Sequence, residues 1–203
     1  MTSPSTIAFI GGGNMARSLI GGLIARGTAP ADIRVSEPVD ALRDALARDF
    51  GVSAGADNAE AVGRAGLWVL AVKPQVLRMV CEALAPLAQA QRPLVVSIAA
   101  GITATQLQRW LGGGVAVVRA MPNTPALLGA GVTGLFASTE VDANGRERAA
   151  KLLSSAGKTV WIESETLMDA VTAVSGSGPA YIFLLAEAMI DNAGLKDLLA
   201  KKW

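Results

Sequence analysis

Residues 6–16 read TIAFIGGGNMA, an apolar run followed at once by three glycines and the start of a helical pattern. The stretch matches G-x-G-x-x-[GA], with Gly11, Gly13 and Ala16 at the key positions. Gly11 would permit a tight turn, Gly13 would let the backbone approach a diphosphate, and Ala16 would keep the helix close to the strand. The order of strand, glycine turn and helix predicts dinucleotide binding, and an ordinary glycine-rich turn is the alternative.

The same alternation of strands and helices continues along the chain. Expected strands are residues 6–10, 33–36, 67–72, 94–98, 115–119, 132–137 and 159–162. Helical patterns occupy residues 16–26, 39–50, 75–84, 105–111 and 144–157. The runs at 67–72 and 94–98 lack polar alternation, which is typical of strands buried on both faces. The sequence therefore predicts a doubly wound, mostly parallel α/β sheet of Rossmann type.

Composition narrows the classes of partner. The 203 residues are 51% hydrophobic, enough for a sizeable core without disulfides or metals. Lys and Arg total 18 against 17 Asp and Glu, so no basic field indicates nucleic acid. No segment approaches about 18 unbroken apolar residues, so no membrane span is expected. A small-molecule partner and a cytoplasmic location are the expectations.

The numbers of histidine and cysteine residues limit the catalytic chemistry that the chain can perform. The chain has no histidine, which excludes a Ser-His-Asp triad and argues against a catalytic zinc site, so no metal is expected. The single cysteine, Cys81, fits a reducing compartment and is interpreted as a buried core thiol. Hydrolases become poor candidates.

The end of the second expected strand is the place for an adenosine ribose. Glu37 there would accept from a 2′-hydroxyl, which favours NAD. Ser36 would instead donate to a 2′-phosphate, with Arg34 or Arg43 nearby. A solvated glutamate is the third interpretation, so the choice between NAD and NADP stays open.

From Pro179 to Ala193 the pattern leaves hardly any polar face, and a helix that is apolar all round must be buried. Pro179 suits the first helical position and Gly194 suits the end. Only Leu195–Trp203 follows, too little to cover this helix. We therefore expect either a second copy of the chain over it or a chain that is incomplete.

Five segments in this order carry a resemblance to a known family. They are FIGGGNMA at 9–16, AVKPQ at 71–75, SIAAG at 97–101, RAMPNTP at 119–125 and VSGSGPAY at 174–181. Together they resemble the signature segments of pyrroline-5-carboxylate reductases, enzymes that reduce a cyclic imine to proline with NAD(P)H. The likeness is expected to end near Met189, with the family's C-terminal helices and their Ser/Thr/Gly-rich substrate loop missing.

The resemblance implies a cofactor site at strand ends, where ligands bind in open parallel sheets. Residues 71–74 and 99–101 would line the nicotinamide side, and Asn58 the ribose region. The full set of expected cofactor residues is Gly11, Gly12, Gly13, Asn14, Met15, Ser36, Glu37, Asn58, Ala71, Val72, Lys73, Pro74, Ala99, Ala100 and Gly101. Lys73 is included for its backbone position, and a lysine with an exposed ammonium is the equal alternative.

Two segments are expected to contact substrate, through Met121, Asn123, Thr124, Ser175, Gly176 and Ser177. The prolines of the first segment would present polar groups to a pocket, and a rigid structural turn is the alternative. The second would open the buried helix, so that its N–H groups receive the substrate carboxylate. Plain capping by serine is the alternative there. No catalytic side chain is assigned, and any proton donor must be a hydroxyl, a lysine or water.

The resemblance also implies a division into domains and an oligomeric state. Residues 1–163 would form the Rossmann domain, and residues 164–203 the beginning of a helical dimerisation domain, giving a homodimer or higher homo-oligomer. The main hypothesis is reduction of the C=N bond of 1-pyrroline-5-carboxylate with NADP or NAD as cofactor. A truncated nucleotide-binding remnant without turnover is the second, and another Rossmann-type dehydrogenase is the third.

Overall fold

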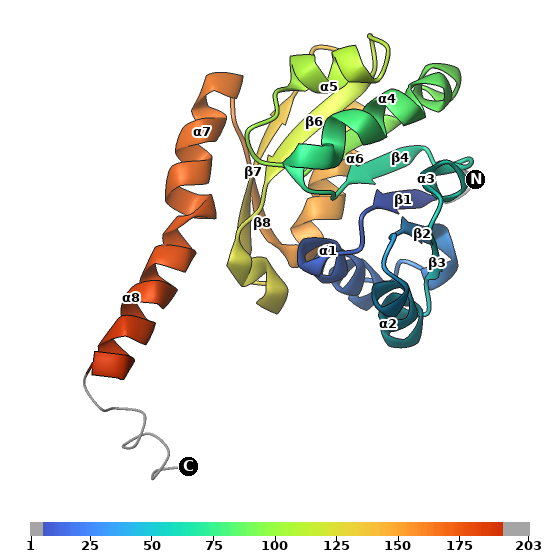
Figure 1. The fold of residues 1–203 in the computed structure, drawn as a ribbon. Coiled ribbons are helices and arrows are strands. Elements are labelled where there is room, and N and C mark those ends of the chain that lie inside the picture. Colours follow the sequence, from blue (N-terminus) through green and yellow to red (C-terminus); the bar gives the residue numbers. More distant parts are fainter. Residues whose placement is uncertain (1–5, 193–203) are drawn as a thin grey trace.

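The computed structural model describes residues 6–192 as a single eight-stranded sheet with helices on both faces. The strands are β1 (Ile7–Ile10), β2 (Ile33–Ser36), β3 (Ser53–Gly55), β4 (Leu67–Leu70), β5 (Leu94–Ser97), β6 (Ala116–Met121), β7 (Gly131–Ala137) and β8 (Gly157–Trp161). Their order across the sheet is β3-β2-β1-β4-β5-β6-β7-β8. The expected doubly wound, mostly parallel sheet is confirmed (Figure 1).

Helices cover both faces of this sheet and continue beyond it. They are α1 (Asn14–Ala25), α2 (Asp40–Phe50), α3 (Asn58–Val62), α4 (Pro74–Gln91), α5 (Ala104–Trp110), α6 (Ala143–Leu153), α7 (Met168–Val171) and α8 (Gly178–Asn192). Helices α1, α2 and α6 pack on one face, and α3, α4 and α5 on the other. Figure 1 shows α7 and α8 in line as one long rod at the side of the sheet.

The core has two halves because successive strand residues point to opposite faces. In β1, Phe9 belongs to the half under α1, whereas Ala8 and Ile10 belong to the half under α4. Every residue of β4 and β5 is buried, as expected for central parallel strands. Trp68 is fully buried, and its indole N–H donates to the Ala65 carbonyl at 2.9 Å.

Strand β7 runs antiparallel to β6, whereas the other pairs are parallel. Only a short 3-10 turn, Thr124–Leu128, joins the two strands, and a parallel partner needs a crossover of a dozen or more residues. The sequence analysis did not anticipate β3 and α3. Both are too short to show a periodic pattern.

The predicted start of the last helix is wrong. Helical structure begins at Glu165 and runs through one π-helical turn, Thr172–Gly176, into α8. The glycines and serines before Pro179 suggested a break, but the Ser177 N–H donates to the Thr172 carbonyl at 2.8 Å and keeps the path helical. Ser175 and Gly176 therefore lie inside the rod rather than at its N-terminus. The expected end at Ala193–Gly194 lies outside the described residues.

Helix α8 exposes its apolar side chains in the single chain. Tyr181, Ile182, Phe183, Leu184, Leu185 and Met189 are all about 60% exposed. The helical segment Glu165–Asp191 is long and apolar enough to cross a membrane by length and composition. An exposed apolar surface of this kind is typical of an interaction site.

Candidate cofactor and substrate site

The three glycines of the first turn have different surroundings. Gly11 has φ +100°, and a Cβ there would lie 2.7 Å from the Ala71 carbonyl oxygen. A Cβ at Gly12 would meet Leu46 Cδ1 at 2.6 Å. A Cβ at Gly13 would meet nothing within 4 Å. Gly11 is thus required by its backbone conformation and by the Ala71 carbonyl, Gly12 lies against the end of the Leu46 side chain, and Gly13 borders open space.

The N-terminus of α1 opens onto that space. Gly13 precedes the helix and supplies no side-chain cap, and the first turn carries no acidic residue. The uncapped N–H groups and the helix dipole favour an anion. A dinucleotide diphosphate fits a helix start that is left uncapped beside an open glycine.

The carboxyl ends of the central strands meet beside this turn. The Gly11 N–H donates to the Ser36 carbonyl and the Ala71 N–H to the Ile10 carbonyl, both at 2.8 Å. The Ile98 N–H donates to the Leu70 carbonyl at 3.1 Å. The turns after β1, β2, β4 and β5 are thereby joined along one edge, where the sequence analysis placed the cofactor.

Residues 71–74 and 99–101 follow β4 and β5 at that edge. Ala99 is buried, while Ala100 and Gly101 are exposed, Gly101 with φ +74°. Lys73 lies just before α4 with an exposed side chain. This agrees with the interpretation of an exposed ammonium.

Glu37 is buried, so its interpretation as a solvated glutamate is wrong. Its carboxylate accepts from the Gly12 N–H at 2.9 Å and from the Val39 N–H at 3.0 Å. The side chain therefore braces the glycine turn from within. Ser36 is also buried, and its hydroxyl donates to Asn58 Oδ1, so that these two predicted residues are in contact.

The two arginines considered for a 2′-phosphate, Arg34 and Arg43, differ in their exposure and in their hydrogen bonds. Arg43 donates to the carbonyls of Glu37 and Pro38 at 2.7 and 2.9 Å and pairs with Asp40. Arg34 is exposed, and its guanidinium lies beside Gly63. Arg34 is the more accessible of the two.

The two predicted substrate segments, about fifty residues apart, lie in contact. The Asn123 amide donates to Ser175 Oγ at 3.3 Å, and Asn123 Oδ1 accepts from the Val132 N–H at 2.9 Å. A Cβ at Gly176 would lie 2.5 Å from Met121 Cε. Thr124 is exposed at the start of the following turn.

The predicted role of Ser175–Pro179 as a helix N-terminus is wrong. The Ser177 N–H is used within the rod, and its carbonyl accepts from the N–H groups of Ala180 and Tyr181. Backbone N–H groups there are consumed by helical bonding, so side-chain hydroxyls are the groups left to bind a carboxylate.

Sequence reasoning missed two residues at this site. Arg119 is 5% exposed within β6, and its Nη1 lies 2.8 Å from Glu165 Oε1. The same oxygen accepts from the Ala104 N–H at 2.6 Å. An arginine inside an apolar strand was the available signal, because a buried charge needs a partner of opposite sign.

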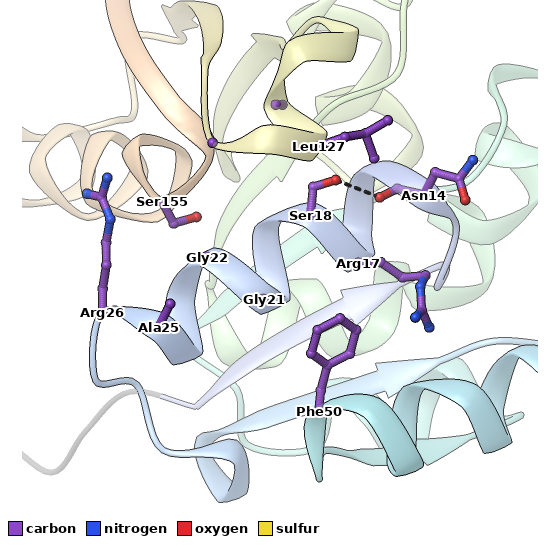
Figure 2. Close-up of a pocket in the computed structure, with 12 residues that line it drawn as sticks. Asn14, Arg17, Ser18, Gly21, Gly22, Ala25, Arg26, Phe50, Leu127 and Ser155 are labelled. Atoms are coloured by element: carbon purple, nitrogen blue, oxygen red, sulfur yellow. Dashed lines mark hydrogen bonds between the residues drawn. The ribbon is translucent and has the colours of Figure 1, made fainter. Parts of the chain in front are cut away.

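Two cavities lie near these residues. One of about 500 Å³ runs along α1, with Phe50 on one side and Leu127 on the other (Figure 2). Of the predicted cofactor residues it includes Asn14 alone, so it is not the predicted cofactor site. The other, about 360 Å³, is lined by apolar side chains of β7, β8 and α7 and reaches Ser175.

Residues 6–192 contain no group of three or more side chains suited to hold a metal ion. Cys81 is buried as expected, and desolvation raises the pKa of its thiol to about 12. It therefore remains a neutral thiol at physiological pH and is not a nucleophile.

Two family models match the chain. Residues 6–101 match the model described as NADP oxidoreductase coenzyme F420-dependent, and residues 165–202 match pyrroline-5-carboxylate reductase dimerisation. The second match extends beyond Met189, so the expectation that the likeness ends there is wrong.

Individual relatives agree with these models. A pyrroline-5-carboxylate reductase of Pseudomonas aeruginosa is 53% identical over 94% of this chain and 69% of its own length. The reductase of Synechocystis is 44% identical over 97% of this chain and 73% of its own.

Solved structures give the same result. A pyrroline-5-carboxylate reductase from Coxiella burnetii has a TM-score of 0.88 at 42% identity, covering 95% of this chain and 71% of that one. The Plasmodium falciparum reductase, solved with NADP bound, has a TM-score of 0.82 at 27% identity, covering 95% and 70%.

Fold and site together define an NAD(P)-dependent oxidoreductase with a Rossmann-type domain. The turn at Gly13 and the joined segments at Met121 and Ser175 lie at the carboxyl edge that such enzymes use. The chain belongs to the pyrroline-5-carboxylate reductase family.

Proposed function

We propose that this chain reduces the C=N bond of 1-pyrroline-5-carboxylate to L-proline, the reaction of its family in proline biosynthesis. The observation that carries the proposal is the contact between the two signature segments, through the Asn123–Ser175 hydrogen bond and the Met121–Gly176 packing. Of these residues Ser175 also lines an apolar cavity, and a small ring with one carboxylate needs such a polar group beside apolar walls.

We propose that the cofactor residues expected from the sequence bind NADH or NADPH. Only the role of Glu37 differs from the expectation. Gly13 and the first turn of α1 hold the diphosphate, and Ser36 with Asn58 faces the adenosine ribose or its phosphate. Glu37 supports the glycine turn. When bound, NADH or NADPH supplies the hydride.

Ser175 is the proposed contact to the substrate carboxylate. Its oxygen accepts from the Asn123 amide, and no acceptor for its own hydrogen is found among residues 6–192. The hydroxyl is therefore free to donate to a carboxylate oxygen. The Val132 N–H donates to Asn123 Oδ1, and this hydrogen bond fixes the orientation of the Asn123 amide.

A protonated cyclic imine needs only a hydride at its carbon, because its nitrogen already carries the proton of the amine product. The chain then has to orient the ring and stabilise the carboxylate, and neither task requires histidine. An imine that arrives unprotonated takes its proton from a hydroxyl, a lysine or water.

Loss of dihydronicotinamide absorbance on addition of the cyclic imine tests the proposal. We expect turnover, and a rise in KM of roughly tenfold in Ser175→Ala from loss of one hydrogen bond to a charge. Ser164→Ala is the matched control, because Ser164 is exposed and its hydroxyl bonds only to that of Thr166 among the described residues. Cofactor binding without any turnover would instead establish the nucleotide-binding remnant.

We further propose the division into a Rossmann domain, residues 1–163, and a helical dimerisation domain from residue 164. The sheet ends at Trp161 and the rod begins at Glu165; residues 193–203 lie outside the described residues. The exposed α8 is covered by a second copy of the chain, in a homodimer or higher homo-oligomer, and the protein is cytoplasmic. The dimerisation model over 165–202 supports this pairing.

A further inference from the structure

One carboxylate oxygen joins three parts of the molecule. Glu165 Oε1 lies 2.8 Å from Arg119 Nη1 and 2.6 Å from the Ala104 backbone nitrogen. Glu165 begins the helical rod, Arg119 belongs to β6, and Ala104 begins α5 just after the 99–101 loop. The contact thus connects the proposed nicotinamide side with the rod that carries Ser175 and Gly176.

The rod touches the sheet at two further points. A Cβ at Gly134 would lie 2.8 Å from Val171 Cγ1, so β7 makes room for that side chain. Further along, Gly176 lies against Met121. These contacts hold the rod to β6 and β7, whereas the Glu165 contact also reaches the loop after β5. The sheet register adds to the link, because Arg119 pairs with Ser97, the last residue of β5.

The ion pair is poorly suited to a role in stability alone. The side chains of Arg119 and Glu165 are only 7% and 24% exposed, so both charges lose hydration. Arg119 Nε is also buried without a hydrogen-bond partner among residues 6–192. Well-packed apolar residues are often at least as stabilising as such a pair.

We propose that Arg119 and Glu165 are positioning residues that hold the Ser175–Gly176 turn at a set distance from the 99–101 loop. This rests on the proposed function, because the turn holds the imine and the loop lies on the nicotinamide side. The two residues act through backbone placement and do not touch the reacting atoms. A displacement of about 1 Å between reacting groups can cost about a hundredfold in rate.

Glu165→Gln tests the proposal, since it keeps the shape and an acceptor for the Ala104 N–H but removes the charge that holds Arg119. We expect kcat to fall at least about tenfold. The dissociation constant of NADPH and the KM for the imine should stay within about threefold of the parent values. A primary isotope effect with cofactor deuterated at the transferred position should rise, because hydride transfer becomes slower relative to other steps.

Hydrogen exchange provides a readout that does not depend on turnover. Amides of residues 99–104 and 172–178 should exchange faster in Glu165→Gln, with no change at residues 11–16. Glu82→Gln is the matched control, because Glu82 pairs with Arg78 on the surface of α4. It should change neither exchange nor kcat.

A double variant, Arg119→Met with Glu165→Leu, separates positioning from stability. It replaces both charges with apolar side chains, so folding should be retained while kcat stays low. Full kcat in the folded double variant, or unchanged exchange at both segments in Glu165→Gln, overturns the positioning role. An unmutated chain with no turnover refutes the proposed function instead, and the exchange measurement still decides whether the contact couples the two segments.

Discussion

Gly176 lies so close to Met121 that a Cβ at position 176 would stand 2.5 Å from the methionine methyl carbon. The glycine gives room for a contact between the helical rod and the end of β6 and is not part of a turn. Because Met121 Cε is the far end of a flexible side chain, the clash can be relieved by a rotamer change.

We therefore expect Gly176→Ala to change the free energy of unfolding by less than about 1.5 kcal/mol while raising the KM for the imine several-fold. Adding Met121→Ala to Gly176→Ala should lower the KM part of the way back to the parent value, because the clash is removed. Urea unfolding and steady-state kinetics on the four proteins of this double-mutant cycle make the measurement. Additive effects on KM would show that the contact is irrelevant to substrate.

Gly13→Val should abolish nucleotide binding with little loss of stability. A Cβ at Gly13 meets nothing within 4 Å, so the change fills only the space proposed for the diphosphate. Gly11→Ala is the contrasting control: its φ of +100° and the nearby Ala71 carbonyl should cost about 1–3 kcal/mol of stability. Unchanged NADPH affinity of Gly13→Val in a fluorescence titration would remove this turn from the cofactor site.

Phe183→Asp should convert an oligomer to a monomer. Phe183 is 58% exposed in the single chain, and burial of such a side chain contributes roughly 1.5–3 kcal/mol per copy. An unpaired carboxylate in the interface opposes association. Light scattering measures the mass, and Glu187→Gln on the same helix is the control that should leave it unchanged. A monomeric parent protein at high concentration contradicts the proposed pairing.

Cys81 should make stability fall at alkaline pH. Burial raises the pKa of its thiol from 9.0 to about 12, so the folded state keeps a proton that the unfolded state releases. The stabilisation is complete below pH 9.0 and is lost as pH rises toward about 12. Denaturant unfolding of the parent and of Cys81→Ala should show a stability difference that shrinks above pH 9.0. A difference independent of pH would mean that the thiol is accessible to water.

The sequence by itself determined the elements whose signals are local. The apolar run before Gly11, the unbroken apolar strands around Val69 and Val96, and the glycine pattern each depend on neighbouring residues. Alternation of strand and helix was then sufficient to predict the parallel sheet and the edge at which the cofactor residues gather.

Tertiary structure alone decided what depends on contacts between distant residues. Glu37 turns inward because the Gly12 N–H needs an acceptor, and Arg119 is buried because Glu165 reaches it. The Ser175–Gly178 stretch stays helical although its glycines and serines favour a cap, since Asn123 and Met121 hold it against the sheet. A local preference of this kind contributes about 1 kcal/mol, which contacts with a packed sheet readily exceed.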